Sequence, residues 1–161
     1  MEYIPIKWDK MEKGRLHLVF LGTYFHTVDE RNRLSIPKKF RDELGFKAIL
    51  TRGLDGCLFL YNLEIWEGIV ERIRQTPLTK SDARSFARHV LSGAMEVEID
   101  RLGRVIIPSY LKEFAAIEKD IAVLAVGERI EIWSKQQWGN YSKDLAKRSD
   151  EVAERLSESG I

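Results

Sequence analysis

The pattern D-x-x-x-R-x-x-I-P occurs twice in this chain, and in each occurrence an arginine follows an aspartate by four residues. The first pair is Asp29 and Arg33, and the second pair, Asp100 and Arg104, comes 71 residues later. Arginine presents a planar fork of donors that matches phosphate oxygens and the O6 and N7 edge of guanine. Aspartate can accept backbone N–H bonds across its own turn or hold the arginine through a charge-assisted bond. The spacing indicates either two basic turns that contact nucleic acid or two pairs that only staple their turns.

The residues around each arginine complete two candidate binding sites. Asn32 and Gly103 precede the arginines, and both residue types tolerate the positive φ that a tight turn requires. We expect Arg33 and Arg104 to contact base edges or to approach phosphates closely. The residues expected to neutralise backbone phosphates are Arg31, Lys38 and Arg101. The residues expected to orient the turns are Asp29, Asn32, Asp100 and Gly103.

The charge of the whole chain gives no support for binding a polyanion, because the formal net charge is only +1. The distribution of charge does support it. Residues 29–41 hold five basic and two acidic side chains, and residues 100–112 hold three basic and one acidic. Both candidate sites are therefore locally basic, which favours a nucleic-acid partner.

A catalytic site would require Asp29 and Asp100 to meet across a twofold axis, as in an acid-protease dyad. Such a dyad needs small hydrogen-bonding neighbours, whereas each aspartate here precedes charged residues and an arginine that would keep it ionised. His17, His26 and His89 share no metal-ligand spacing, and no glycine-rich phosphate loop follows a strand. We therefore expect no enzyme, metal, cofactor or small-molecule substrate.

Other features bound the location of the protein. Cys57 is the only cysteine and lies in an apolar stretch, so an internal disulfide is excluded and a buried thiol is expected. The longest apolar run, residues 121–126, is far shorter than the roughly 20 residues of a membrane helix. The N-terminus lacks the apolar core of a signal peptide. We expect a cytoplasmic protein with no membrane partner.

The candidate sites belong to a module that occurs twice. Residues 22–41 recur at residues 93–112 with an offset of 71, and Trp66 recurs as Trp138 at an offset of 72. A unit of roughly 50 residues is near the size at which a single hydrophobic core becomes marginal. The two copies are therefore expected to stabilise each other as a pseudo-dimer whose halves pack face to face.

Each copy has the same predicted order of elements. Residues 24–28 and 33–36 form a β-hairpin with a basic tip, and Pro37 begins a short helix. Two further strands and an amphipathic helix complete the module, with Trp66 and Trp138 packed in the core and not stacked on bases. The other strands are expected at residues 48–51, 58–61, 95–99, 105–107, 121–126 and 129–133.

The predicted domain boundaries follow the duplication. The first module spans residues 20–75, a connecting helix spans residues 76–92, and the second module spans residues 93–141. A helical tail covers residues 142–161. Residues 1–18 form an N-terminal extension.

The string from Phe20 to His26, followed by two copies of the pattern D-x-x-x-R-x-x-I-P, closely resembles the MraZ family. The resemblance spans roughly residues 19–141. It implies an α+β fold in which two tandem AbrB-like swapped-hairpin modules form a pseudo-twofold barrel with flanking helices. It also implies a ring-like homo-oligomer that binds short direct repeats in promoter DNA and associates with the nucleoid.

The same resemblance implies a transcriptional regulator. The family residues carry over to Asp29 and Arg33 in the first copy and to Asp100 and Arg104 in the second. By family default the protein represses the bacterial division and cell-wall gene cluster, which includes its own gene. The alternative is an AbrB-like protein-interaction or antitoxin-type module that binds no operator.

Two features depart from the family pattern. The family usually has glycine before the arginine, whereas the first copy has Asn32, the best non-glycine residue at positive φ. The family also begins almost at Phe20, so we expect a misassigned start, with Val19 as the true first residue read from a GTG codon. Against this, the apolar residues at positions 4, 6 and 8 alternate like a real strand. The N-terminal mass of the native protein tests the expectation.

Overall fold

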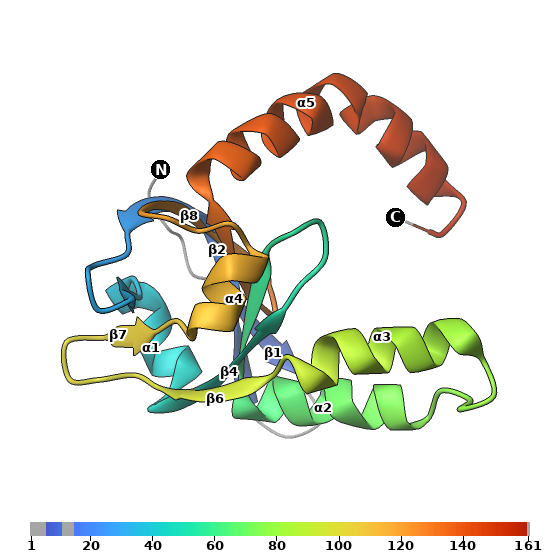
Figure 1. The fold of residues 1–161 in the computed structure, drawn as a ribbon. Helices are drawn as coiled ribbons and strands as arrows, with labels where there is room; N and C mark the ends of the chain where they lie inside the picture. Colours follow the sequence, from blue (N-terminus) through green and yellow to red (C-terminus); the bar gives the residue numbers. More distant parts are fainter. Residues whose placement is uncertain (1–5, 11–14, 161) are drawn as a thin grey trace.

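The computed structural model describes residues 6–10 and 15–160 (Figure 1). Residues 1–5 and 11–14 of the predicted extension, and residue 161 of the predicted tail, lie outside the described residues. The strands are β1 (Ile6–Lys10), β2 (Arg15–Thr27), β3 (Arg33–Ser35), β4 (Lys47–Arg52), β5 (Leu58–Asn62), β6 (Met95–Glu98), β7 (Arg104–Ile106), β8 (Asp120–Gly127) and β9 (Ile130–Ser134). The helices are α1 (Lys38–Leu44), α2 (Leu63–Arg74), α3 (Ser81–Ser92), α4 (Ser109–Phe114) and α5 (Lys135–Ser157). The chain therefore has an α+β fold.

The two copies of the module interleave in one large antiparallel sheet. Its order is β1-β2-β8-β9-β5-β4-β6, so β2 of the first copy pairs with β8 of the second, and β6 of the second pairs with β4 of the first. At the centre, β5 pairs with its equivalent β9, with Leu58 opposite Ile132 and Leu60 opposite Ile130. The repeat offset of 72 exchanges these two pairs, so a pseudo-twofold axis relates the copies. The expectation of face-to-face packing was wrong, because the copies share one sheet.

The predicted hairpins were also wrong in their pairing. The chain does reverse at residues 29–32, where the Asp29 N–H donates to the Arg33 carbonyl (3.0 Å). However, β2 pairs with β8, and β3 pairs with β7 in a separate two-stranded ribbon. In the second copy β6 pairs with β4, and β7 pairs with β3. Each turn therefore connects the large sheet to the ribbon.

One face of the large sheet packs against α1, α4 and the ribbon. The buried side chains that these elements contribute include Phe40 of α1, Leu111 of α4, Leu34 of β3 and Val105 of β7. The Phe40 ring packs edge-on against Phe20 of β2, with 5.3 Å between ring centroids. Pro37 precedes α1, and Gly45, with φ 75°, ends it. Residues from both copies thus form one core beneath the ribbon.

The opposite face of the sheet packs against α2 and α5 through aromatic side chains. The ring centroid of Trp138 lies 5.3 Å from that of Trp133, and the ring centroid of Trp66 lies 5.9 Å from that of Tyr61. Both helical tryptophans are partly buried against this cluster, and Cys57 is fully buried within it. The predicted packing role of the tryptophans is confirmed.

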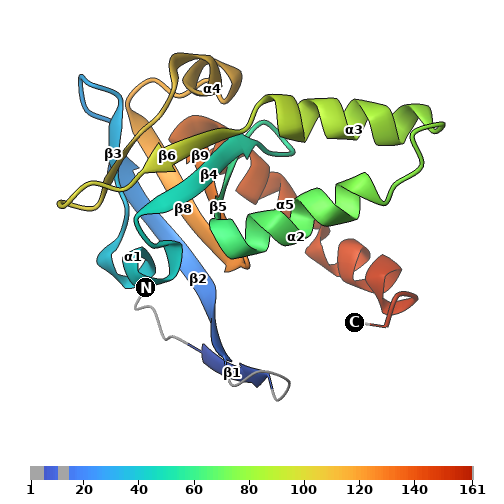
Figure 2. The same cartoon turned by 90° about the horizontal axis from the view of Figure 1, so that it is seen from below.

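The helices that follow the two sheet halves differ. α2 and α3 lie side by side and project from the sheet, whereas α5 runs as one long helix (Figures 1 and 2). Thr51 of β4 donates from Oγ1 to the Val90 carbonyl (2.5 Å), which ties α3 to the sheet. α5 continues without a break to Ser157, so most of the predicted tail is the end of this helix.

Candidate nucleic-acid interface

The two turns have the same hydrogen-bond pattern. Asp29 Oδ1 accepts from the backbone N–H groups of Arg31 and Arg33 (both 2.9 Å), and Oδ2 accepts from Arg33 Nε (2.7 Å). In the second turn Asp100 makes the equivalent bonds at 2.9, 2.9 and 2.8 Å. Each aspartate therefore spans its turn and holds the arginine that ends it.

These bonds keep both carboxyl groups ionised. The backbone N–H of Arg33 is the main cause of the lowered pKa of Asp29, and the side-chain bond from the same arginine adds to it. Arg104 lowers the pKa of Asp100 in the same way. An acid-protease dyad needs one carboxyl group with a raised pKa. The geometry of these aspartates suits the orientation of arginines and not that chemistry.

Both turns contain a residue with positive φ just before the arginine. Asn32 has φ 59° and Gly103 has φ 76°. The Asn32 N–H donates to the Asp29 carbonyl (3.0 Å), and the Gly103 N–H donates to the Asp100 carbonyl (2.9 Å). Asparagine in the first copy therefore forms the same turn as glycine in the second.

The ribbon of β3 and β7 places the two arginines on one face. Its register pairs are Arg33 with Ile106, Leu34 with Val105, and Ser35 with Arg104. The middle pair is fully buried beneath the ribbon. Because successive side chains of a strand point to opposite faces, the other two pairs share the outer side. We call these four residues, Arg33, Ser35, Arg104 and Ile106, the outer ribbon face.

One backbone bond joins each turn to the far end of the strand that pairs with its own ribbon strand. The Ile36 N–H donates to the Gly103 carbonyl, and the Ile107 N–H donates to the Asn32 carbonyl, both at 2.8 Å. Hydrogen-bonded and non-hydrogen-bonded pairs alternate along an antiparallel ladder, so the pairs of the outer ribbon face are non-hydrogen-bonded. Paired Cα atoms are about 4.5 Å apart at such positions. The outer side chains therefore lie close together, with one turn at each end of the ribbon.

The arginines are held without being hidden. The side chain of Arg33 is 26% exposed, and that of Arg104 is 28% exposed. The bond to aspartate uses Nε, one of five donors on the guanidinium group. Arg31 and Arg101 are exposed in the two turns, and Lys38 is exposed at the start of α1. The structure therefore places Arg33 and Arg104 on the same face of the ribbon, on different strands and diagonal to each other, and leaves the other three cations exposed.

One further cation from each copy lies near the turn of the other copy. Lys112 of α4 donates from Nζ to Asn32 Oδ1 (2.9 Å), and Arg41 of α1 donates from Nε to the Ile36 carbonyl (2.9 Å). The Arg41 guanidinium also occupies the space that a Cβ at Gly103 would need. The sequence prediction omitted both cations from the site, although they are equivalent at the repeat offset of 71. That equivalence was the signal that could have identified them.

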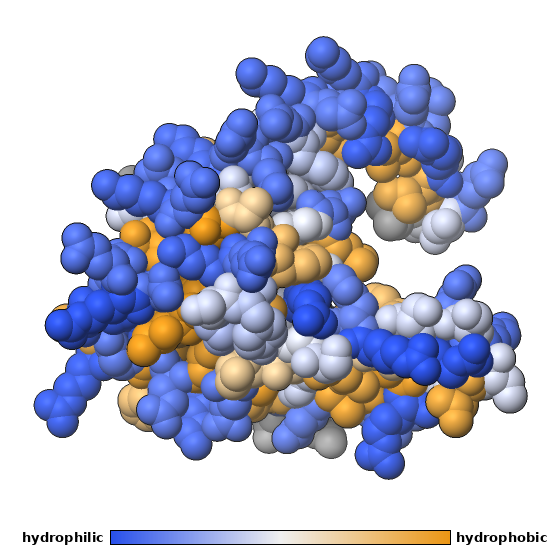
Figure 3. All heavy atoms as spheres, viewed as in Figure 1, coloured by the Kyte–Doolittle hydropathy of each residue, from blue (hydrophilic) through white to orange (hydrophobic). Residues whose placement is uncertain are grey.

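The surface around the ribbon is mixed in polarity. On the side shown in Figure 3, hydrophilic side chains cover the edge where β7 and its turn lie in Figure 1, with apolar atoms between them. The large apolar side chains exposed in this part of the chain are Leu102 and Ile106. The ribbon edge is therefore hydrophilic with an apolar component.

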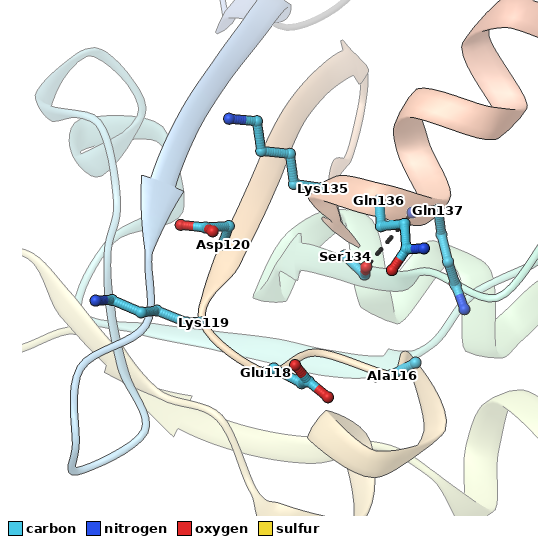
Figure 4. Close-up of a pocket in the computed structure, with 8 residues that line it drawn as sticks. All are labelled: Ala116, Glu118, Lys119, Asp120, Ser134, Lys135, Gln136 and Gln137. Carbon is cyan, nitrogen blue, oxygen red and sulfur yellow. Dashed lines mark hydrogen bonds between the residues drawn. The ribbon is translucent and has the colours of Figure 1, made fainter.

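A separate hollow of about 480 Å³ lies beside the N-terminus of α5 (Figure 4). Charged side chains in its lining, such as Glu118, Lys119 and Lys135, extend in different directions. Small-molecule sites are mostly apolar, with a few convergent polar groups, so this hollow does not resemble one. Among the described residues, no three His, Cys, Asp or Glu side chains gather to hold a metal ion. No helix in the same part of the chain has the length and apolar character to span a membrane.

Comparison with known proteins finds the repeat again. A family model described as "MraZ protein, putative antitoxin-like" matches the chain twice, at residues 19–89 and 90–159. A protein named "Transcriptional regulator MraZ" from Caldanaerobacter subterraneus subsp. tengcongensis is 50% identical over 143 residues, which is 89% of this chain and 100% of the relative. Relatives of the same name occur in Alkaliphilus metalliredigens, at 47% identity over 89% of this chain and 100% of the relative, and in Moorella thermoacetica, at 42% over 86% and 96%. Each family match contains one turn and one ribbon strand.

Proposed function

Because the chain belongs to the MraZ family, we propose that it is a transcriptional regulator that binds double-stranded DNA sequence-specifically. The observation that supports this most is the outer ribbon face, where Arg33 and Arg104, one from each copy, lie on the same exposed side. The relatives are named as transcriptional regulators, which agrees with a DNA-binding role.

A two-stranded antiparallel ribbon fits the major groove of B-DNA, which is about 12 Å wide. In that position the forks of Arg33 and Arg104 meet guanine edges or nearby phosphates, and the aspartate bonds limit their freedom before binding. The cations that neutralise backbone phosphates are Arg31, Lys38 and Arg101. Arg41 and Lys112 act indirectly, because Lys112 bonds to Asn32 in the turn of the other copy and the Arg41 guanidinium lies against Gly103 in the other turn.

The proposal includes the assembly expected of the family. We propose that the strand exchange between the copies is the swapped-hairpin barrel arrangement and that several chains assemble into a ring. One ribbon offers only two central arginines, so its affinity for DNA is modest. Linked ribbons that bind successive direct repeats gain from high effective concentration. Oligomerisation is then part of how the protein selects a promoter with several repeats.

The proposed target follows from the family resemblance. The protein represses the bacterial division and cell-wall gene cluster, including its own gene, and acts in the cytoplasm on the nucleoid. Short direct repeats in the DNA immediately upstream of its gene are the expected operator.

Gel-shift titration with this upstream DNA tests the proposal. We expect Arg33→Ala to weaken binding about tenfold or more, since a bidentate guanine contact contributes about 1–3 kcal/mol. The slope of affinity against salt concentration should fall, because fewer phosphates are neutralised. Arg33→Lys is the matched control: it keeps the charge but not the fork, so the salt slope should persist while preference for the operator falls. Unchanged affinity of Arg33→Ala in intact oligomers would contradict the proposal.

The alternative is a protein-interaction module, which the words "antitoxin-like" in the family description favour. The same titration separates the two. Retention of upstream DNA with preference for the repeats supports regulation. Binding to a partner protein without retention of any DNA fragment supports the alternative.

A further inference from the structure

The outer ribbon face follows the pseudo-twofold symmetry in its arginines but not in its other two residues. Arg33 and Arg104 are equivalent at the repeat offset of 71, and so are Ser35 and Ile106. One strand therefore presents a small hydroxyl group where the other presents a branched apolar side chain. The two halves of the ribbon are chemically different at this position.

Ile106 is exposed although its neighbours are not. Its exposed fraction is 59%, whereas Val105 and Ile107 are fully buried. Single exposed apolar side chains are common and usually need no explanation. This one, however, lies between two arginines on the surface that is proposed to face DNA.

The register places Ile106 at one end of the outer ribbon face, next to both arginines. It lies directly opposite Arg33 in a non-hydrogen-bonded pair, where side chains approach most closely. Arg104 lies two residues earlier on the same strand, on the same side. The bonds from both arginines to their aspartates direct part of each guanidinium toward its turn. An apolar group is therefore flanked by two cations at a spacing fixed by the backbone.

Building on the proposed DNA binding, we propose that Ile106 recognises a thymine through its 5-methyl group. Among the base edges of the major groove, thymine presents this methyl group beside its O4 acceptor. Flanking arginines that meet phosphates or guanines bring the ribbon close enough for Ile106 to cover the methyl group. Ser35, at the equivalent position, can donate or accept a hydrogen bond and so tolerates several bases. The ribbon then recognises an asymmetric sequence, which gives each operator repeat a direction.

Substitution of single thymines by deoxyuridine tests the proposal, because it removes only the methyl group. In an upstream fragment that wild type retains, we expect one thymine per contacted repeat at which deoxyuridine weakens binding about three- to fivefold, the effect of exposing about one buried methyl group. Ile106→Ser should bind thymine and deoxyuridine equally at that position, whereas Ile106→Val should keep the preference. Leu102→Ser is the matched control, because Leu102 is 63% exposed but lies in the turn. This control should also keep the preference.

The inference is wrong if wild type binds every deoxyuridine fragment as tightly as the thymine fragment. It is also wrong if Ile106→Ser keeps the wild-type preference for thymine. A changed oligomer size of Ile106→Ser in size-exclusion chromatography would assign Ile106 to a protein contact instead. Circular dichroism should show native folding of each variant, because Ile106 lies on the surface. Retention without a methyl effect refutes this inference alone, whereas no retention of any fragment by wild type refutes the proposed function as well.

Discussion

At the scale of single residues, each turn is matched to a cation from the other copy. Asn32 gives Lys112 an acceptor for its ammonium group at 2.9 Å. Gly103 has no side chain and so leaves room for the larger guanidinium of Arg41. The residue before each arginine is therefore matched to a cation of the other copy, by a hydrogen bond at Asn32 and by the space it leaves at Gly103.

This matching predicts the effect of Gly103→Ala. The substitution should destabilise the protein by about 2 kcal/mol, because an alanine at φ 76° costs about 1–2 kcal/mol and its Cβ would also displace Arg41. In an Arg41→Ala background the clash is absent, so the same substitution should cost about 1 kcal/mol. Urea unfolding of the four proteins measures both costs. An equal cost in the two backgrounds would show that Arg41 does not occupy this space.

The aspartates predict how stability depends on pH. Both have a pKa lowered below 3.8 in the folded protein, chiefly by the backbone N–H of Arg33 or Arg104. A lowered folded pKa contributes stability above the unfolded value, near 3.9, and this contribution is lost as pH falls through the folded pKa. The free energy of unfolding of wild type should therefore fall more steeply below pH 4 than that of an Asp29→Asn, Asp100→Asn double variant. Parallel pH curves for the two proteins would contradict the assigned bonds.

At the scale of elements, the large sheet separates the ribbon from the aromatic layer. The ribbon packs on one face with α1 and α4, and the tryptophans of α2 and α5 pack on the other. Changes in the aromatic layer should therefore affect stability without altering the surface proposed to contact DNA.

Trp138→Ala tests this separation. Its ring lies 5.3 Å from Trp133 and is partly buried, so its loss should cost about 2 kcal/mol, less than the 3–5 kcal/mol typical of a fully buried tryptophan. DNA affinity per folded molecule should not change. Lys143→Ala, on an exposed position of the same helix, is the control and should stay within about 0.5 kcal/mol of wild type. Thermal unfolding and gel shifts at a temperature where the variant is folded measure the two effects.

The elements were predictable from sequence because their signals are local. Pro37 and Gly45 bound α1, and the residue types at positions 32 and 103 predicted positive φ. The strand partners were not predictable from the sequence. Equivalent strands of the two copies have the same alternation of apolar and polar residues, so this alternation is satisfied whether β4 pairs with β2 of its own copy or with β6 of the other. The roles of Arg41 and Lys112 depend on that exchange of partners. They were missed for the same reason.

At the scale of the whole molecule, neither copy contains all the partners of its own strands, although β4 pairs with β5 and β8 pairs with β9 within a copy. β2, β3, β5 and β6 all pair with strands of the other copy. The core beneath the ribbon is likewise built from both copies. The folded unit is therefore the complete duplicated chain.

Expression of the two halves as separate chains tests this conclusion. Residues 20–76 and residues 77–160 should each be unfolded or self-associated when alone, because their strand edges and apolar faces lack partners. Mixed in equal amounts, they should form a one-to-one complex with a single cooperative unfolding transition. Size-exclusion chromatography and circular dichroism measure these states. A folded monomer of either half would contradict the conclusion.

The exchange of strands also limits how the gene can evolve. Deleting one copy would leave a product whose strands could recover their partners only in a second molecule. A gene that encodes this single-chain fold must therefore retain both copies. The two copies also cannot change independently. A substitution at position 32 must remain compatible with Lys112, which lies 80 positions away in the other copy and bonds to Asn32.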